Sequence, residues 1–108
     1  MIEGLYKVRY RAPKHEGFCI CVFKDGQISG GGASMYYIGT YKRSGNHFIG
    51  ELHARKHDRS IENPILGLED FHLQLDGTVC GEYGQLTGTI REVPGAVLQA
   101  NVLRLCAL

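Results

Sequence analysis

The sequence predicts an all-β protein, a single small antiparallel up-and-down β-barrel of about eight strands, with residues 1–108 forming one domain. Three observations predict this fold. Apolar and polar residues alternate along most of the chain, which is typical of half-buried strands. Tight-turn residues separate the alternating segments at short intervals. Glycine accounts for 15 of 108 residues, about twice the usual share, and it allows the bending that closes a small barrel.

A six-residue phrase recurs along the chain, at residues 25–30, 45–50, 76–81 and 83–88. Each copy places a turn residue before an apolar residue and a glycine that lie two positions apart. Residues two apart share one face of a strand. We therefore interpret each copy as a tight turn that begins a strand whose first inward positions are one apolar side chain and one glycine.

The first half of the chain contains five expected strands. They cover residues 5–11, 17–24, a short segment that ends in the glycines 30–32, 35–43 and 47–55. Asp25-Gly26 predicts a hairpin between the second and third strands, because Asp-Gly favours the positive-φ turn that matches strand twist. Ser44-Gly45-Asn46 predicts the turn between the fourth and fifth.

The second half opens with one long connection over residues 56–70, which carries Pro64 and mixed charge. A strand is expected over 71–75, followed by a turn at Asp76-Gly77. The remaining expected strands cover residues 78–82, 85–92 (as a continuation or a further strand) and 97–105.

Alternation also predicts which residues face the barrel interior. They are Tyr6, Val8, Tyr10, Ile28, Gly30, Tyr37, Gly39, Tyr41, Phe48, Gly50, Leu52, Phe71, Leu73, Leu75, Leu86, Gly88, Ile90, Leu98, Ala100 and Val102. The glycines in this set remove side-chain volume, so a cavity for an apolar small molecule is one expectation. Its candidate lining residues are Tyr6, Tyr37, Gly39, Tyr41, Phe48, Gly50 and Gly88. The alternative is that neighbouring aromatic side chains fill the space.

Several outer strand faces are also apolar, which indicates that another chain covers them as a homodimer, or that residues 56–70 do so. Leu103 and Leu105 fall outside. On the second expected strand, one of two alternating sets must face outward: either Phe18, Ile20 and Val22, or Cys19, Cys21 and Phe23. We assign the set with the two cysteines to a candidate dimer surface, together with two residues of the fourth strand. This surface consists of Cys19, Cys21, Phe23, Tyr36 and Ile38.

The bulk composition narrows the function classes. A net charge of +1 gives no long-range attraction to nucleic acid or to an anionic membrane. No apolar run approaches membrane-spanning length, and no secretory signal is recognised at the start, so we expect a cytoplasmic protein. In a reducing compartment, Cys19, Cys21, Cys80 and Cys106 are expected as buried thiols rather than disulfides. A four-thiolate zinc site is the alternative, although one intervening residue is not the usual zinc-knuckle spacing.

The sequence contains no recognisable catalytic set, so we expect a non-enzymatic protein with no cofactor and no metal. His53 and His57 lie at the end of a strand and in a loop, where their spacing carries little meaning. Glu51 shares the solvent-facing side of its strand with His53. Glu69-Asp70 reads as a solvated loop pair. An enzyme of unknown chemistry is a distant third function.

The first third of the chain resembles the GrlR family of small negative regulators of bacterial type III secretion genes. The likeness lies in residues 4–8, in Gly17, in residues 24–31 and in residues 34–39. The resemblance implies a lipocalin-like barrel that is cytoplasmic and dimeric and that binds a protein partner, a transcriptional activator, rather than catalysing a reaction.

One hairpin departs from that family. The family presents an acidic hairpin tip after the Tyr-x-Gly strand, and the tip is implicated in gripping the activator. Here the corresponding stretch is basic and neutral: Lys42, Arg43, Ser44, Gly45 and Asn46. A partner that the family recognises through opposite charge would be repelled or not engaged here, so this stretch is a candidate partner-binding hairpin for an unidentified partner. The predicted function is thus a protein-binding regulatory barrel, with a carrier of an apolar small molecule as the alternative.

Overall fold

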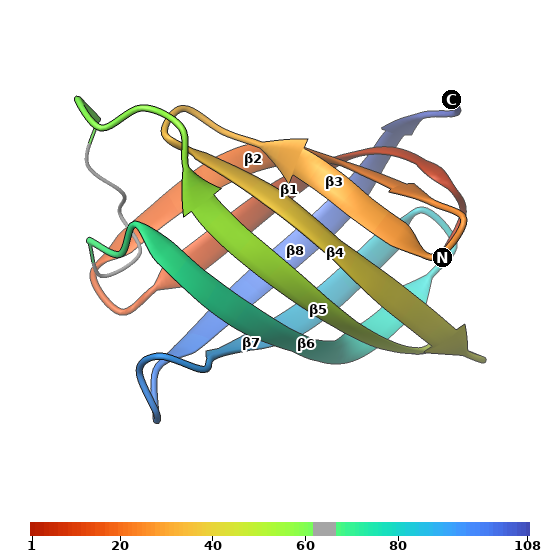
Figure 1. The fold of residues 1–108 in the computed structure, drawn as a ribbon. Helices are drawn as coiled ribbons and strands as arrows, with labels where there is room; N and C mark the ends of the chain where they lie inside the picture. The colour runs from red at the N-terminus through yellow and green to blue at the C-terminus, as the bar shows by residue number, and fades with distance from the viewer. Residues whose placement is uncertain (62–66) are drawn as a thin grey trace.

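In the computed structural model, which describes residues 1–61 and 67–108, eight antiparallel strands follow one another around a closed barrel (Figure 1). Each strand pairs with its sequence neighbours, and the last pairs with the first. The strands are β1 (Gly4–Ala12), β2 (His15–Lys24), β3 (Gln27–Gly31), β4 (Met35–Ser44), β5 (His47–Lys56), β6 (Asp70–Cys80), β7 (Tyr83–Ile90) and β8 (Val97–Cys106). The predicted all-β up-and-down barrel is confirmed.

The interior follows the predicted alternation, since the residues assigned to it are buried or half-buried. Phe23, from β2, lies in an aromatic cluster, with its ring centroid 5.1 Å from that of Tyr6, 5.6 Å from that of Tyr41 and 6.1 Å from that of Phe48. Tyr41 and Phe48 stack on each other at 5.4 Å. Burying such a side chain contributes about 1.5–3 kcal/mol, so this cluster stabilises the end of the barrel near the β4–β5 hairpin.

The tight turns between β2 and β3 and between β4 and β5 are confirmed. Asp25 has a φ of 52° and Gly26 a φ of 74°, as a two-residue turn between twisted strands requires at both central positions. Gly45 has a φ of 60° and lies between β4 and β5. These backbone angles explain why Asp-Gly and Gly-Asn stand at the two tips.

The predicted turn at Asp76-Gly77 is wrong, because both residues lie inside the continuous strand β6. Gly77 is there for a different reason. A Cβ on it would lie 2.1 Å from the carbonyl oxygen of Gln85 in β7, so glycine allows the two strands to approach closely. The chain turns instead at Gly81, whose φ is 59°. The two short strands expected around Asp76-Gly77 are therefore one.

The face assigned to β2 is also wrong. Cys19, Cys21 and Phe23 point into the barrel, where they are 7%, 4% and 2% exposed. Phe18 and Ile20 face outward instead, at 53% and 42% exposed. Both faces of this strand are apolar, so alternation alone does not choose between them. The pairing of Cys21 with the inward-facing Tyr6 of β1 settles the register.

The described ends of the long connection between β5 and β6, residues 57–61 and 67–69, lie at the same end of the barrel as the β3–β4 loop (Figure 1). Its first residues are anchored there: the backbone N–H of His57 donates to the carbonyl of Ser34 at 2.8 Å. Pro64, and any cover that residues 62–66 give to an apolar face, fall outside the described residues. No helix in the described part of the chain is long and apolar enough to cross a membrane.

Candidate functional site

A groove of about 380 Å³ crosses the outer faces of β4, β5, β6 and β7. Its lining mixes an apolar residue, Ile38, with ionisable ones, among them His53, His72 and Arg91. The register of the sheet produces this mixture, because Ile38 pairs with His53 on β5 and His53 pairs with His72 on β6. Residues directly opposite in register point to the same side of a sheet.

His53 is bound to a carboxylate within the sheet. Its Nε2 donates to Oδ1 of Asp70 at 2.6 Å, and the guanidinium of Arg55 lies 3.6 Å from the other carboxylate oxygen. Asp70 was expected in a solvated loop, but it begins β6 and shares its outer face with His72. The expectation that Glu51 and His53 share an outer face is confirmed.

His72 is held by a carboxylate from the loop after β7. Its Nδ1 donates to Oε2 of Glu92 at 2.6 Å, and its backbone N–H donates to Oε1 at 2.7 Å. The hydrogen bond from the His72 ring, and then the one from its backbone, lower the pKa of the Glu92 carboxyl to about 2. Glu92 is therefore an ionised acceptor at neutral pH, which fixes the proton of the neutral His72 ring on Nδ1.

The two histidine rings lie against each other, with centroids 4.2 Å apart and planes 11° apart. His53, Asp70 and His72 each offer one ligand atom, and these atoms lie within 4.8 Å of one another. This is the donor set in the described residues that could hold a metal ion. His57 does not belong to it, because its Nε2 lies 2.9 Å from the carbonyl oxygen of Gly32.

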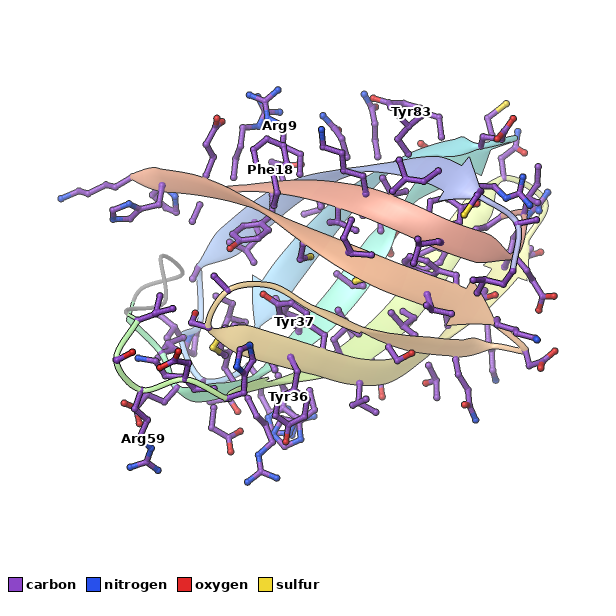
Figure 2. The ribbon with its side chains drawn as sticks, turned by 90° about the horizontal axis from the view of Figure 1, so that it is seen from above. Arg9, Phe18, Tyr36, Tyr37, Arg59 and Tyr83 are labelled. Atoms are coloured by element: carbon purple, nitrogen blue, oxygen red, sulfur yellow. The ribbon has the colours of Figure 1, made fainter. Side chains whose placement is uncertain are left out.

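The barrel interior contains a cavity of only about 60 Å³. Of the residues expected to line an interior ligand site, Tyr37 and Gly88 line this cavity, whereas Tyr6, Gly39, Tyr41, Phe48 and Gly50 do not. The side chain of Tyr37 is buried inside the barrel (Figure 2). Burial, followed by the neighbouring Cys19 and Tyr10, raises the pKa of its hydroxyl. Of the expected lining set, this cavity therefore brings together Tyr37 and Gly88.

The glycines explain why the interior is nearly full. A Cβ on Gly39 would lie 1.8 Å from the carbonyl oxygen of Glu51, and one on Gly30 would lie 2.1 Å from that of Ile20. At Gly50 the nearest atoms are the carbonyl oxygen of Thr40 and the Phe48 ring, at 3.1 and 3.2 Å. The missing side chains therefore admit neighbouring backbone and aromatic rings rather than a ligand.

Exposed apolar residues of β2 and β8, with one at the start of β7, flank β1 on the outside of the barrel. They are Phe18, Ile20, Tyr83, Leu103 and Leu105, which are between 42% and 53% exposed. Lys7 lies among them, paired with both Ile20 and Leu103. Its ammonium lies 4.9 Å from the centroid of the Phe18 ring, a cation–π contact. We call this surface the β8–β1–β2 face.

The other predicted outer residues are Tyr36 and Ile38, which are 37% and 54% exposed on β4. They are separate from the β8–β1–β2 face: Figure 2 shows Phe18 and Tyr83 on one side of the barrel and Tyr36 on the opposite side. The candidate dimer surface built from Cys19, Cys21, Phe23, Tyr36 and Ile38 is thus corrected. Two of its members are outside, three are inside, and the larger apolar face lies elsewhere.

The candidate partner-binding hairpin is an exposed tip between β4 and β5. Lys42, Arg43, Ser44, Gly45 and Asn46 are all exposed. The guanidinium Nε of Arg43 donates to the carbonyl of Gly45 at 2.6 Å, which ties one of the two basic side chains to the turn. The tip therefore presents Lys42 and a rigid basic turn to the solvent.

The cysteines do not form a four-thiolate site. Cys19 and Cys21 are buried with their sulfur atoms 3.9 Å apart, whereas Cys80 and Cys106 are exposed on the outer face, contrary to the expectation of buried thiols. The hydrogen bond with Cys21, and then burial, raise the pKa of the Cys19 thiol. Cys19 is consequently a protonated, unreactive core residue.

The fold defines the chain as a closed eight-stranded antiparallel barrel. The sequence matches no protein-family model and no curated protein.

Proposed function

We propose that this chain is a non-enzymatic, protein-binding regulatory barrel of the lipocalin-like shape, cytoplasmic and homodimeric, that acts as the GrlR-like negative regulators of type III secretion genes do. The observation that carries the proposal is the β8–β1–β2 face. Exposed apolar patches on small soluble proteins typically mark surfaces that bind another protein. The resemblance over residues 4–39 supports the regulatory role.

The composition of the face fits a second copy of this chain as one occupant. Phe18 and Ile20 on β2 and Leu103 on β8 supply apolar contact area on either side of β1. Arg9 of β1 lies opposite Phe18 and forms an ion pair with Glu16 at 3.0 Å. The middle of the face carries the basic side chains Lys7 and Arg9 of β1, and such a mixture of aromatic, apolar and arginine side chains is common at protein interfaces. The basic hairpin that carries Lys42 joins β4 to β5, which are not among the strands of this face, and we assign it to a heterologous partner of acidic character.

The alternative, a carrier of an apolar ligand, has less support. An interior cavity of about 60 Å³ is well below the roughly 300–1,000 Å³ of small-molecule sites. Native mass spectrometry of the protein from its native host tests this alternative directly, because a carrier would retain a stoichiometric small molecule.

The dimer is tested by light scattering coupled to size-exclusion chromatography. The wild type is expected to elute at twice the chain mass, and Ile20→Glu to elute as a folded monomer. Ile49→Glu is the matched control, because Ile49 is also 42% exposed but lies on the outer face of β5. A monomeric wild type, or equal effects of the two substitutions, would remove the homodimer from the proposal.

The heterologous partner is tested by co-purification from the native host. Wild-type protein is expected to retain a stoichiometric acidic protein, and Lys42→Glu to lose it while keeping the same oligomeric state. If neither protein retains a partner, the regulatory proposal loses its support.

A further inference from the structure

We propose that His53, Asp70 and His72 form a binding site for a divalent transition-metal ion of the zinc class, with Glu92 as the residue that orients His72. The site lies on the outer face of β5 and β6, in the groove of about 380 Å³. It is independent of the β8–β1–β2 face and does not rest on the proposed regulatory function.

The donor set has the chemistry that such ions prefer. Two imidazole nitrogens and one carboxylate oxygen bind zinc, copper(II), nickel(II) and iron(II). The ligand atoms of His53, Asp70 and His72 already lie within 4.8 Å of one another. Two of the donors come from one strand, because Asp70 and His72 are two apart on β6 and so share a face. The third, His53, pairs directly with His72 across the ladder.

The arrangement around His72 is the second observation. Metal-bound histidines usually donate their other ring N–H to a carboxylate, which fixes the tautomer and the ring orientation. Here Nδ1 of His72 donates to Glu92 at 2.6 Å, so the lone pair of the neutral ring is on Nε2. Glu92 also accepts the backbone N–H of His72 at 2.7 Å, which anchors the carboxylate to the strand that carries the ligand.

Asp70 and His53 fit the same assignment. Their atoms Oδ1 and Nε2 lie 2.6 Å apart in a hydrogen bond, whose proton a metal ion would displace. Ligands about 2.0–2.1 Å from a tetrahedral zinc ion are about 3.4 Å apart, so these two side chains must separate by under about 1 Å. An imidazole lone pair lies in the ring plane and the two rings are stacked 11° from parallel, so the His53 ring must also rotate out of the stack to bind the ion that His72 binds. Both side chains have the freedom to move, since that of His53 is 38% exposed and that of Asp70 is 53% exposed. Arg55 lies near Oδ2 of Asp70, which leaves Oδ1 for the ion.

Three protein ligands leave at least one coordination position open. That position is filled by water or by a donor atom from a group that enters the groove. The ion would join β5 to β6, and through Glu92 it would also fix the loop that follows β7.

The test is calorimetric titration with Zn²⁺ in a Cys80→Ser/Cys106→Ser background, since those two thiols are exposed and would compete for the ion. His53→Ala and His72→Ala are each expected to weaken binding more than about 100-fold, and Glu92→Ala about 10- to 100-fold, the range for groups that orient a ligand. His47→Ala is the matched control, because His47 also pairs with a carboxylate of β6, Asp76, at 2.8 Å on the same outer face. It is expected to leave the affinity unchanged.

A second measurement needs no variant. Cu²⁺ bound to the same background protein is expected to show coupling to two imidazole nitrogens in its electron paramagnetic resonance spectrum. Unchanged Zn²⁺ affinity in both His53→Ala and His72→Ala, an equal loss in His47→Ala, or coupling to a single nitrogen would each overturn the proposal.

Discussion

His53 and His72 stack ring on ring across two strands, with their centroids 4.2 Å apart and their planes 11° apart. Each ring donates to a different carboxylate, Asp70 for one and Glu92 for the other. The stack and these two hydrogen bonds therefore join β5, β6 and the loop after β7 into one polar cluster on the outer face of the barrel. The cluster lines the groove on β4 to β7 with ionisable side chains, whereas the β8–β1–β2 face exposes mainly apolar ones.

Alkaline pH is expected to destabilise the barrel through Tyr37. Burial is the main reason that the pKa of its hydroxyl is raised in the folded state, whereas in the unfolded chain it is about 10. The folded state thus retains a proton that the unfolded state loses, so this contribution to stability is present below pH 10 and is lost as pH rises above it. The melting temperature should fall between pH 9 and pH 11, and it should fall less in Tyr37→Phe. Equal falls in both proteins would contradict the argument.

Thiol labelling is expected to divide the cysteines into two pairs. Cys80 and Cys106 are exposed and should react with an aromatic disulfide reagent at once. Cys19 and Cys21 are buried, and the raised pKa of Cys19 keeps its thiol protonated. In the native protein, two thiols should therefore react rapidly with the reagent, and all four should react only after denaturant is added. Rapid reaction of more than two thiols in the native protein would show that the interior opens.

Gly39→Ala is expected to destabilise the fold strongly. The new Cβ would lie 1.8 Å from the backbone carbonyl oxygen of Glu51, and backbone atoms cannot move aside as a side chain can. Overpacking of this kind costs about 1–3 kcal/mol or more, so we expect at least about 2 kcal/mol from urea denaturation. Gly45→Ala is the control. It meets nothing within 4 Å and carries only the strain of a φ of 60°, about 1 kcal/mol. A smaller loss for Gly39→Ala than for the control would refute the steric argument.

Phe48→Ala is expected to remove about 3–5 kcal/mol of unfolding free energy. Phe48 is fully buried and stacks on Tyr41, so its removal leaves a hole in the aromatic cluster. Ile38→Ala, on an exposed position of β4, should cost under about 1 kcal/mol. Denaturation curves of both variants give the comparison, and near-equal losses would mean that the cluster is not a principal part of the core.

Local patterns were sufficient for the barrel, because alternation and tight turns act over a few residues. Two of the wrong assignments arose where the local signal has two physical meanings. Gly77 follows an aspartate, as turn glycines do, yet it serves the close approach of β7. On β2, Cys19 and Phe18 stand on equally apolar faces, so only pairing with β1 decides which one is inside.

The polar cluster could not be predicted from the sequence, because it depends on pairing between distant strands. His53 and Asp70 are separated by the long connection, whose length leaves the register of β6 against β5 undetermined. The signal that was present is the alternation of Asp70 and His72 at the start of β6. It placed two potential ligands on one face, but not the His53 opposite them or the Glu92 that arrives from the loop after β7.

The pairing of β1 with β8 has a consequence for recognition. It gives each strand of the described barrel a paired neighbour on both sides, so no strand is a free edge along its whole length. The five-residue strand β3 pairs only with residues 20–24 of β2 and 36–40 of β4. Recognition by addition of a full-length strand, a common way for sheets to bind extended peptides, is therefore not open to the closed barrel. A partner that contacts side chains on the outer wall or at the hairpin tips can be selected by single substitutions that do not disturb the ladder.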